Sequence, residues 1–173
     1  IEIGQAISDP WGNDPEDFAV PRFLHATAKI TRVLIDQVDD EQWDEILQLN
    51  LSSCMALTRA FVPGMKENGW GRVIHISSII ALAAAPGRSV YAATKAGLIG
   101  MARAQAIELG PSGITVNCIA PGPFLTDLPA AKLTEEQRNM VGQRTALKRW
   151  GETEELVGPA LLNTAATCDV RGR

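Results

Sequence analysis

A tyrosine and a lysine four residues apart, Tyr91 and Lys95, are the side chains of this 173-residue sequence best suited to acid–base chemistry. In a helix these positions share one face, so the lysine ammonium would stand beside the phenol. A neighbouring positive charge stabilises the ionised phenolate, which lets a tyrosine transfer protons near neutral pH. Ser78 lies thirteen residues before Tyr91. Its hydroxyl could hold a substrate carbonyl oxygen while the phenol protonates that oxygen.

The surrounding sequence predicts a strand, a loop and a helix that would position these side chains. Residues 73–80 form an apolar, β-branched run typical of a strand buried on both faces. After a loop containing Pro86 and Gly87, a helix is expected to run to about Leu109 and to end at Gly110 and Pro111. Ser78 would then lie at the C-terminal end of a strand, where open α/β sheets bind their ligands. Residues 113–120 have the composition of a second buried strand.

A long helix is predicted to precede the first strand. Asp39 and Gln42 have the spacing of a capping box at its start, and Pro63 with Gly64 should bend or end it. Asn50 lies among apolar residues that recur at the helical period. These residues, expected to form an inward stripe, are Trp43, Ile46, Leu47, Cys54, Leu57 and Phe61. A buried amide needs hydrogen-bond partners, so Asn50 is either a structural staple or the holder of a water molecule.

Ser78, the pair Tyr91-x-x-x-Lys95, the Pro-Gly-x-x-x-Thr loop at 121–126 and Asn50 together resemble the short-chain dehydrogenase/reductase family. The resemblance implies an α/β fold with a Rossmann-like, doubly wound parallel sheet. It implies hydride transfer between NAD or NADP and a secondary alcohol or ketone. Tyr91 would be the general acid/base, Lys95 its electrostatic partner, Ser78 the group that orients the carbonyl, and Asn50 the residue that holds a relay water.

The same resemblance implies a set of cofactor contacts. Tyr91 and Lys95 would also touch the cofactor, with Lys95 as a ribose ligand. The remaining cofactor residues belong to the loop after the second strand: Pro121, Gly122, Phe124 and Thr126. The Phe124 backbone and the Thr126 hydroxyl would hold the nicotinamide carboxamide. A capping box at Thr134 opens a further predicted helix, similar to the mobile substrate lid of the family, and the nearby charges Arg144, Lys148 and Arg149 are expected to be solvated.

Two features of the first fifty residues point to a rival interpretation. No glycine-rich TGxxxGxG turn is present there, so the backbone amides that would hold a pyrophosphate are not apparent. Lys29 stands where the family has a glycine close to the cofactor. We therefore expect residues 1–173 to be one partial domain that carries the catalytic half and lacks the N-terminal βαβ units. The alternative is a truncated or degenerate relative without redox chemistry, acting at most as an oligomerising scaffold.

Composition excludes several other classes. The net charge is −4, which argues against nucleic-acid binding, and no apolar run approaches the ~20 residues of a membrane span. Cys54, Cys118 and Cys168 lie far apart without histidine partners, so we expect reduced thiols, no metal site and a cytoplasmic location.

The predicted helix after Tyr91 carries a repeating seam of small residues. Its members are Ala92, Ala96, Gly100 and Ala104. Small side chains at this spacing allow a second helix to pack closely, either within the domain or between subunits. The resemblance favours subunit pairing, so the expected assembly is a homo-oligomer, a tetramer or a dimer. It also points to a small-molecule alcohol or ketone, as in 3-oxoacyl reductases or gluconate-type dehydrogenases, as the substrate.

Overall fold

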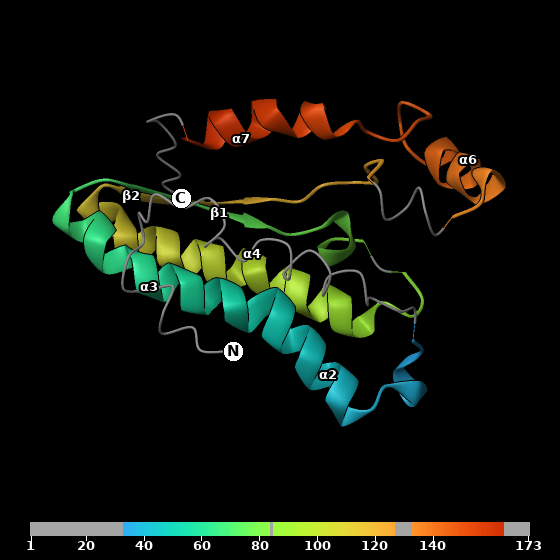
Figure 1. Cartoon of the computed structure of the whole chain (residues 1–173), viewed down its shortest axis with the longest axis horizontal. Coiled ribbons are helices and arrows are strands. Elements are labelled where there is room, and N and C mark those ends of the chain that lie inside the picture. The colour runs from blue at the N-terminus through green and yellow to red at the C-terminus, as the bar shows by residue number, and fades with distance from the viewer. Residues whose placement is uncertain (1–32, 84, 127–132, 165–173) are drawn as a thin grey trace, which may run out of the picture.

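The computed structural model describes residues 33–83, 85–126 and 133–164 (Figure 1). In chain order these residues form η1 (Ile35–Gln37), α2 (Asp40–Leu47), the π-helical turn η2 (Gln48–Ser52), α3 (Ser53–Glu67), β1 (Gly71–Ile76), η3 (Ile79–Ala81), α4 (Ser89–Leu109), η4 (Gly110–Ser112), β2 (Ile114–Ile119), α6 (Glu135–Gln143), η5 (Thr153–Leu156) and α7 (Val157–Thr164). The slot occupied by Lys29 and the position of Cys168 lie outside the described residues.

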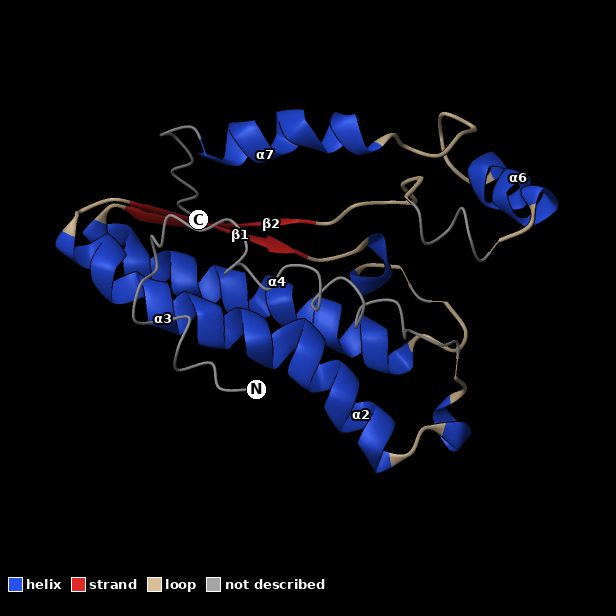
Figure 2. Ribbon diagram, viewed as in Figure 1, coloured by secondary structure: helices blue, strands red, loops and turns tan. Residues whose placement is uncertain are grey.

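A parallel pair of strands forms the centre of the described structure. β1 and β2 run side by side from Gly71 opposite Ile114 to Ile76 opposite Ile119. Helices α3 and α4 lie on one side of this pair, and α7 lies on the other (Figure 2). Helices on both faces of a parallel sheet are the arrangement of doubly wound α/β proteins, which agrees with the predicted fold class.

The core lies between α4 and β2. Leu98, Ala102 and Leu109 of α4 are buried, as are Ile114 and Val116 of β2. The turn between these elements depends on Gly113, which has a φ of 74°. A Cβ atom at Gly113 would lie 2.2 Å from the backbone oxygen of Gly69, so only glycine permits this close approach.

The predicted long helix forms, but it bends at a different place. Asp39 accepts a hydrogen bond from the Gln42 backbone N–H at 2.8 Å, as the capping spacing predicts. Pro63 and Gly64 were expected to bend or end the helix, and the expected end is wrong, because α3 continues to Glu67. Pro63 lies on the exposed face, where water can reach the carbonyl group that the proline leaves without a donor. The chain instead changes direction near η2 (Figure 1).

The π-helical turn also explains why the predicted inward stripe is only partly correct. Trp43, Leu57 and Phe61 are 39%, 47% and 39% exposed, whereas Thr58 is buried. A π-turn accommodates one extra residue, and one residue corresponds to a rotation of about 100° in an α-helix. The two halves of the predicted stripe therefore face different directions.

The other predicted elements differ from the structure mainly at their ends. β1 ends at Ile76, four residues earlier than expected, and residues 79–81 form the 3-10 turn η3. β2 and α4 lie close to their predicted bounds. The capping box at the start of α6 is complete: the Thr134 hydroxyl accepts from the Gln137 N–H, and the Gln137 side chain accepts from the Thr134 N–H.

Candidate active site

The site is built at the C-terminal ends of the two strands. Beyond the ladder, the Ser77 N–H donates to the carbonyl oxygen of Ile119 at 2.7 Å, and the Ile79 N–H donates to that of Pro121 at 2.9 Å. These two bonds hold the segment carrying Ser78 beside the Pro-Gly loop. Two of the predicted site segments, which are far apart in the sequence, are thus brought together at one sheet edge.

Helix α4 is fastened to the end of β1 at Lys95. The Ser77 hydroxyl donates to the Lys95 carbonyl oxygen at 2.7 Å, and the Lys95 Nζ donates to the Ile76 carbonyl oxygen at 2.9 Å. The same Nζ lies 5.7 Å from the centroid of the Tyr91 ring. The structure therefore places the ammonium beside the phenol, as the four-residue spacing predicts.

Burial shifts two titratable groups near this point. Desolvation lowers the pKa of Lys95, and the nearby thiols of Cys54 and Cys118 oppose that shift. Desolvation raises the pKa of Cys118, against hydrogen bonds with Ser77 and the charge of Lys95. Cys118 is therefore held as a neutral thiol, and within the described residues Cys54 and Cys118 form no disulfide.

Ser78 caps the short turn η3 rather than standing free. It is 9% exposed, and its Oγ accepts a hydrogen bond from the Ile80 N–H at 3.2 Å. This contact uses a lone pair and leaves the hydroxyl proton as a donor. The geometry is compatible with a serine that donates to a carbonyl oxygen.

Asn50 reaches α4 through a residue that sequence reasoning missed. Its Nδ2 donates to the Thr94 hydroxyl at 3.4 Å, and that hydroxyl donates to the Tyr91 carbonyl oxygen at 2.9 Å. Asn50 is 4% exposed and Thr94 is fully buried. Asn50 thus acts at least as a staple, because this chain of bonds fixes η2 against the turn that carries Tyr91. The sequence did contain a signal, because Thr94 directly precedes Lys95 and lies on the inward face of the helix.

Removing the Thr94 hydroxyl should destabilise the fold. In Thr94→Val the side chain keeps its shape, but the buried Asn50 amide loses its acceptor, which typically costs about 1–3 kcal/mol. Urea unfolding of the two proteins measures this difference. Thr115→Val is a matched control, because within the described residues the buried Thr115 hydroxyl has no hydrogen-bond partner. Its removal should leave stability unchanged or raise it. An equal loss in both variants would contradict the staple.

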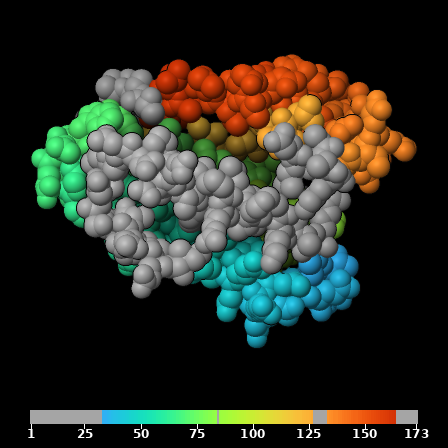
Figure 3. Space-filling view, viewed as in Figure 1, coloured from blue at the N-terminus to red at the C-terminus, as the bar shows by residue number. Residues whose placement is uncertain are grey.

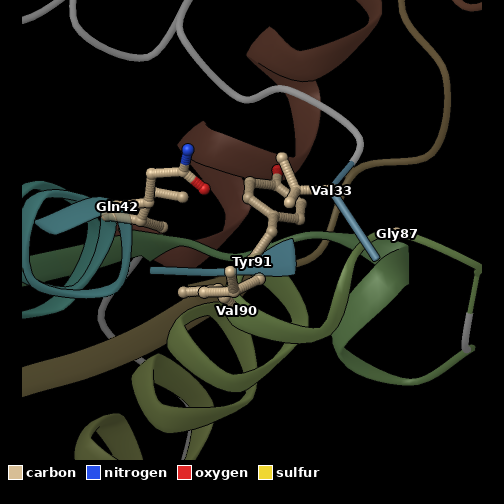
Figure 4. A pocket seen from close by; sticks show the side chains of 7 residues that line it. Val33, Gln42, Gly87, Val90 and Tyr91 are labelled. Carbon is tan, nitrogen blue, oxygen red and sulfur yellow. The ribbon is translucent and has the colours of Figure 1, made fainter. Parts of the chain in front are cut away.

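A small hollow opens beside Tyr91 at the start of α4. Val33, Val38, Ile46 and Val90 give it apolar walls, and Gln42 and Gly87 complete the lining with Tyr91. Figure 4 shows the Tyr91 ring against the Val33 side chain, with the Gln42 side chain extending toward it. The phenol thus borders an apolar hollow that contains one amide.

A second cation lies near the phenol, and sequence reasoning missed it as well. The Arg88 guanidinium carbon is 5.8 Å from the centroid of the Tyr91 ring. Its position three residues before Tyr91 on a helix start is the signal that could have found it. Tyr91 is thus accompanied by Arg88 and Lys95, which adds to the positive potential around the phenol.

The loop after β2 is fixed by a distant part of the chain. Phe124 forms a parallel bridge with Gly151. Within this loop Pro121, Phe124 and their neighbour Pro123 are half-buried, while Gly122 and Thr126 are exposed. The four predicted cofactor residues of this loop therefore lie beside the Ser78 segment, with Thr126 open to solvent.

Arg149 is an exposed charge, as expected, and it is also held in an ion pair. Its Nη1 and Nη2 donate to Glu155 Oε2 and Oε1 at 2.7 and 2.8 Å. The hydrogen bond from Arg149, with a smaller contribution from the Glu152 backbone N–H, lowers the pKa of Glu155 to about 2. Both partners of this two-pronged contact remain partly exposed, which agrees with the expectation of solvated surface charge.

The lowered pKa predicts a pH dependence of stability. Because the folded-state pKa of Glu155 lies below its ordinary 4.5, the carboxylate stabilises the fold above that value and loses its contribution as pH falls toward 2. We expect Glu155→Gln to flatten the part of the stability curve between these pH values. The free energy of unfolding in urea, measured over this range, checks it. Glu154→Gln, a change at the adjacent exposed carboxylate, should leave the curve unchanged.

Metal-binding side-chain groups and membrane-spanning helices are both lacking among the described residues. Among residues 33–83, 85–126 and 133–164, no group of three or more His, Cys, Asp or Glu side chains is placed to hold a metal ion. In the same part of the chain, no helix has both the length and the apolar character to cross a membrane.

Comparison with known proteins places this geometry in a family. Residues 19–163 match the family model described as Enoyl-(Acyl carrier protein) reductase. The chain is 41% identical over 122 residues to nodulation protein G of Azospirillum brasilense, covering 70% of this chain and 49% of that protein. It is 39% identical over 137 residues to the 3-oxoacyl-[acyl-carrier-protein] reductase FabG of Pseudomonas aeruginosa, covering 79% and 55%. The chain thus spans about half the length of these relatives.

Solved structures agree with the sequence relatives. A putative NAD(P)-dependent gluconate 5-dehydrogenase from Beutenbergia cavernae, solved with bound NADP at low occupancy, superposes with a TM-score of 0.74 at 31% identity. The match covers 79% of this chain and 55% of that one. The family model covers both strands, α4 and the Pro-Gly loop, and the relatives and the superposition agree with it. The chain belongs to the short-chain dehydrogenase/reductase family.

Proposed function

We propose that the protein carrying this chain is an NAD- or NADP-dependent oxidoreductase that interconverts a secondary alcohol and a ketone. The observation that carries the proposal is the Lys95 ammonium fastened to β1 and held 5.7 Å from the Tyr91 ring. Both residues stand beside the Ser78 segment at the edge where α/β sheets bind ligands. The names of the relatives, which denote reductases and dehydrogenases, support the same class of reaction.

Each site residue has a defined task in this reaction. A nicotinamide held by the Pro-Gly loop and Lys95 would supply the hydride for the carbonyl carbon in reduction and would accept it in oxidation. Tyr91 donates a proton from its hydroxyl to the carbonyl oxygen, which becomes the alcohol oxygen, and the electrons balance with the oxidation of the nicotinamide. Ser78 donates a hydrogen bond to the same oxygen and orients it. Lys95 stabilises the phenolate that remains and reaches the cofactor ribose.

The remaining residues complete the proposal. Asn50 holds a water molecule that returns a proton toward Tyr91 through Lys95. Pro121, Gly122, Phe124 and Thr126 contact the nicotinamide end of the cofactor. The loop fits the cofactor, because Gly151 is hydrogen-bonded to the Pro123 C=O and the Leu125 N–H. The N–H and C=O of Phe124 point away from Gly151 and are left for a ligand. We further infer that the protein is a homo-oligomer that pairs through the outward face of α4.

Cofactor-coupled turnover by the full-length protein tests the proposal. Purified protein is mixed with NAD or NADP and a panel of secondary alcohols, including hydroxy acids and sugar acids, while the absorbance of the reduced nicotinamide is followed. We expect reduction of one of the two cofactors with at least one alcohol, and reoxidation with the corresponding ketone. Absence of binding of either cofactor by calorimetry would overturn the proposal and favour the non-catalytic scaffold.

A further inference from the structure

The backbone of Gly151 lies directly against the side chain of Phe124. A Cβ atom at Gly151 would stand 2.7 Å from Cε1 and 2.9 Å from Cδ1 of the Phe124 ring. Real side chains do not approach so closely, and the ring would have to move. Gly151 is therefore the residue that allows the 149–155 segment to reach the Pro-Gly loop at all.

Two backbone hydrogen bonds flank Phe124. The Gly151 N–H donates to the Pro123 carbonyl oxygen at 2.9 Å, and the Leu125 N–H donates to the Gly151 carbonyl oxygen at 2.9 Å. Because successive backbone groups of an extended chain alternate in direction, the N–H and C=O of Phe124 itself face the opposite side. Within the described residues neither of these two groups forms a hydrogen bond. The bridge to Gly151 thus directs the Phe124 N–H, a donor, and the Phe124 C=O, an acceptor, away from Gly151.

The ion pair between Arg149 and Glu155 is hydrogen-bonded to the residues on either side of Gly151. Besides its two bonds to Glu155, the Arg149 Nη1 donates to the carbonyl oxygen of Trp150 at 2.9 Å. The Glu155 Oε2 accepts from the Glu152 N–H at 2.7 Å. The peptide groups before and after Gly151 are each bonded to one partner of the pair. We call residues 149–155, closed in this way, the clasp.

The clasp is also bonded to α6. The Trp150 Nε1 donates to the Arg138 carbonyl oxygen at 2.7 Å, and the Trp150 ring packs against Gly142. The Thr145 hydroxyl lies within hydrogen-bond distance of the carbonyl oxygens of Gly142 and Arg149, which share its single proton, and it accepts from the Arg149 N–H. In the space-filling view α6 and α7 form one continuous band along an edge of the molecule, with the clasp between them in sequence (Figure 3). The clasp is therefore anchored to α6 and to the turn that follows it.

We propose that Arg149 and Glu155 are positioning residues, which hold Gly151 so that the Phe124 backbone presents its N–H and C=O to the carboxamide of a bound nicotinamide. The inference rests on the proposed function, and it concerns how the cofactor is oriented rather than whether hydride is transferred. The carboxamide has a carbonyl oxygen that accepts and N–H groups that donate. The Phe124 N–H can therefore donate to its oxygen, and the Phe124 C=O can accept from its N–H. The residues that set this match lie outside the Pro-Gly loop itself.

The test compares two ligands that differ only in the nicotinamide. NADPH or NADH and the corresponding ADP-ribose share the adenine, pyrophosphate and both ribose groups. In the full-length protein, Glu155→Gln should weaken binding of the reduced cofactor by about threefold to fivefold, the range of an exposed pair, and leave ADP-ribose binding unchanged. Gly151→Ala should weaken cofactor binding by about tenfold or more, because the added methyl group displaces Phe124. Glu154→Gln is the matched control and should alter neither ligand.

Amide hydrogen exchange provides a readout that does not need a cofactor. The Leu125 amide should exchange several-fold faster in Glu155→Gln than in the unmodified protein or in Glu154→Gln. Equal loss of both ligands, or unchanged binding and exchange in Glu155→Gln and Gly151→Ala, would overturn the clasp. If the unmodified protein binds neither ligand, the proposed function fails and the cofactor role of the clasp fails with it, while Leu125 exchange still decides whether the clasp holds the loop.

Discussion

Replacing Tyr91 with phenylalanine in the full-length protein should lower kcat by about 10²- to 10⁴-fold, the range that a positioned general acid contributes. The substitution removes one oxygen and leaves the ring that faces Lys95 at 5.7 Å. Because the aromatic contact with the cations survives, cofactor binding should change little. Steady-state turnover and calorimetric cofactor titration separate the two effects.

Ser77→Ala is an informative comparison for Tyr91→Phe. The Ser77 hydroxyl donates to the Lys95 carbonyl oxygen and is not assigned to the chemistry. We expect it to affect stability more than turnover, since the partly buried Lys95 carbonyl loses a donor. Turnover that survives in Tyr91→Phe at the level of the unmodified protein would refute the role of the phenol.

Replacing Gly100 with leucine should weaken association through α4 in the proposed homo-oligomer. Ala96, Gly100 and Ala104 are exposed along α4, and the apolar Ile107 on the same face is 79% exposed, whereas Ala92 is half-buried. A leucine at a close helix contact overpacks it by about 1–3 kcal/mol, which raises a dissociation constant by roughly tenfold to a hundredfold. Sedimentation velocity over a concentration series measures the change.

The free subunit should tolerate this leucine. A Cβ at Gly100 would meet no atom within 4 Å, so the melting temperature of the dissociated subunit should remain near that of the unmodified one. Gly100→Ala adds a single methyl group at the same open place and should have a much smaller effect on association. An unchanged mass distribution in Gly100→Leu would exclude this face from the interface.

The elements predicted most accurately are those whose composition and termini agree. α4 and β2 are bounded by Gly110 and Gly113, and α6 begins at a complete capping box at Thr134, so local signals determine their ends. β1 was predicted too long because Ile79 and Ile80 are as apolar as the strand itself. Its true end depends on the Ile79 N–H bonding to Pro121, a contact between residues distant in sequence.

Within the site, spacing predicted what lies on one helix and missed what joins different segments. Tyr91 and Lys95 share a face of α4, so a four-residue interval suffices to place them together. The bond between Asn50 and Thr94 joins residues on separate helices. Arg149 and Glu155 are six residues apart, with Gly151 and the start of η5 between them, an interval to which no regular period assigns a contact. Such pairs depend on loop geometry that composition alone does not specify.

The π-helical turn at Gln48–Ser52 makes this helix sensitive to the deletion or insertion of single residues. Deleting one residue there would favour an ordinary α-helix, in which everything upstream turns by about 100° and shifts by about 1.5 Å relative to α3. Asn50 would then no longer face Thr94, and Gln42 would leave the hollow beside Tyr91. Point substitutions on the exposed side of α2 should be tolerated, whereas a change of length by one codon in this turn should not.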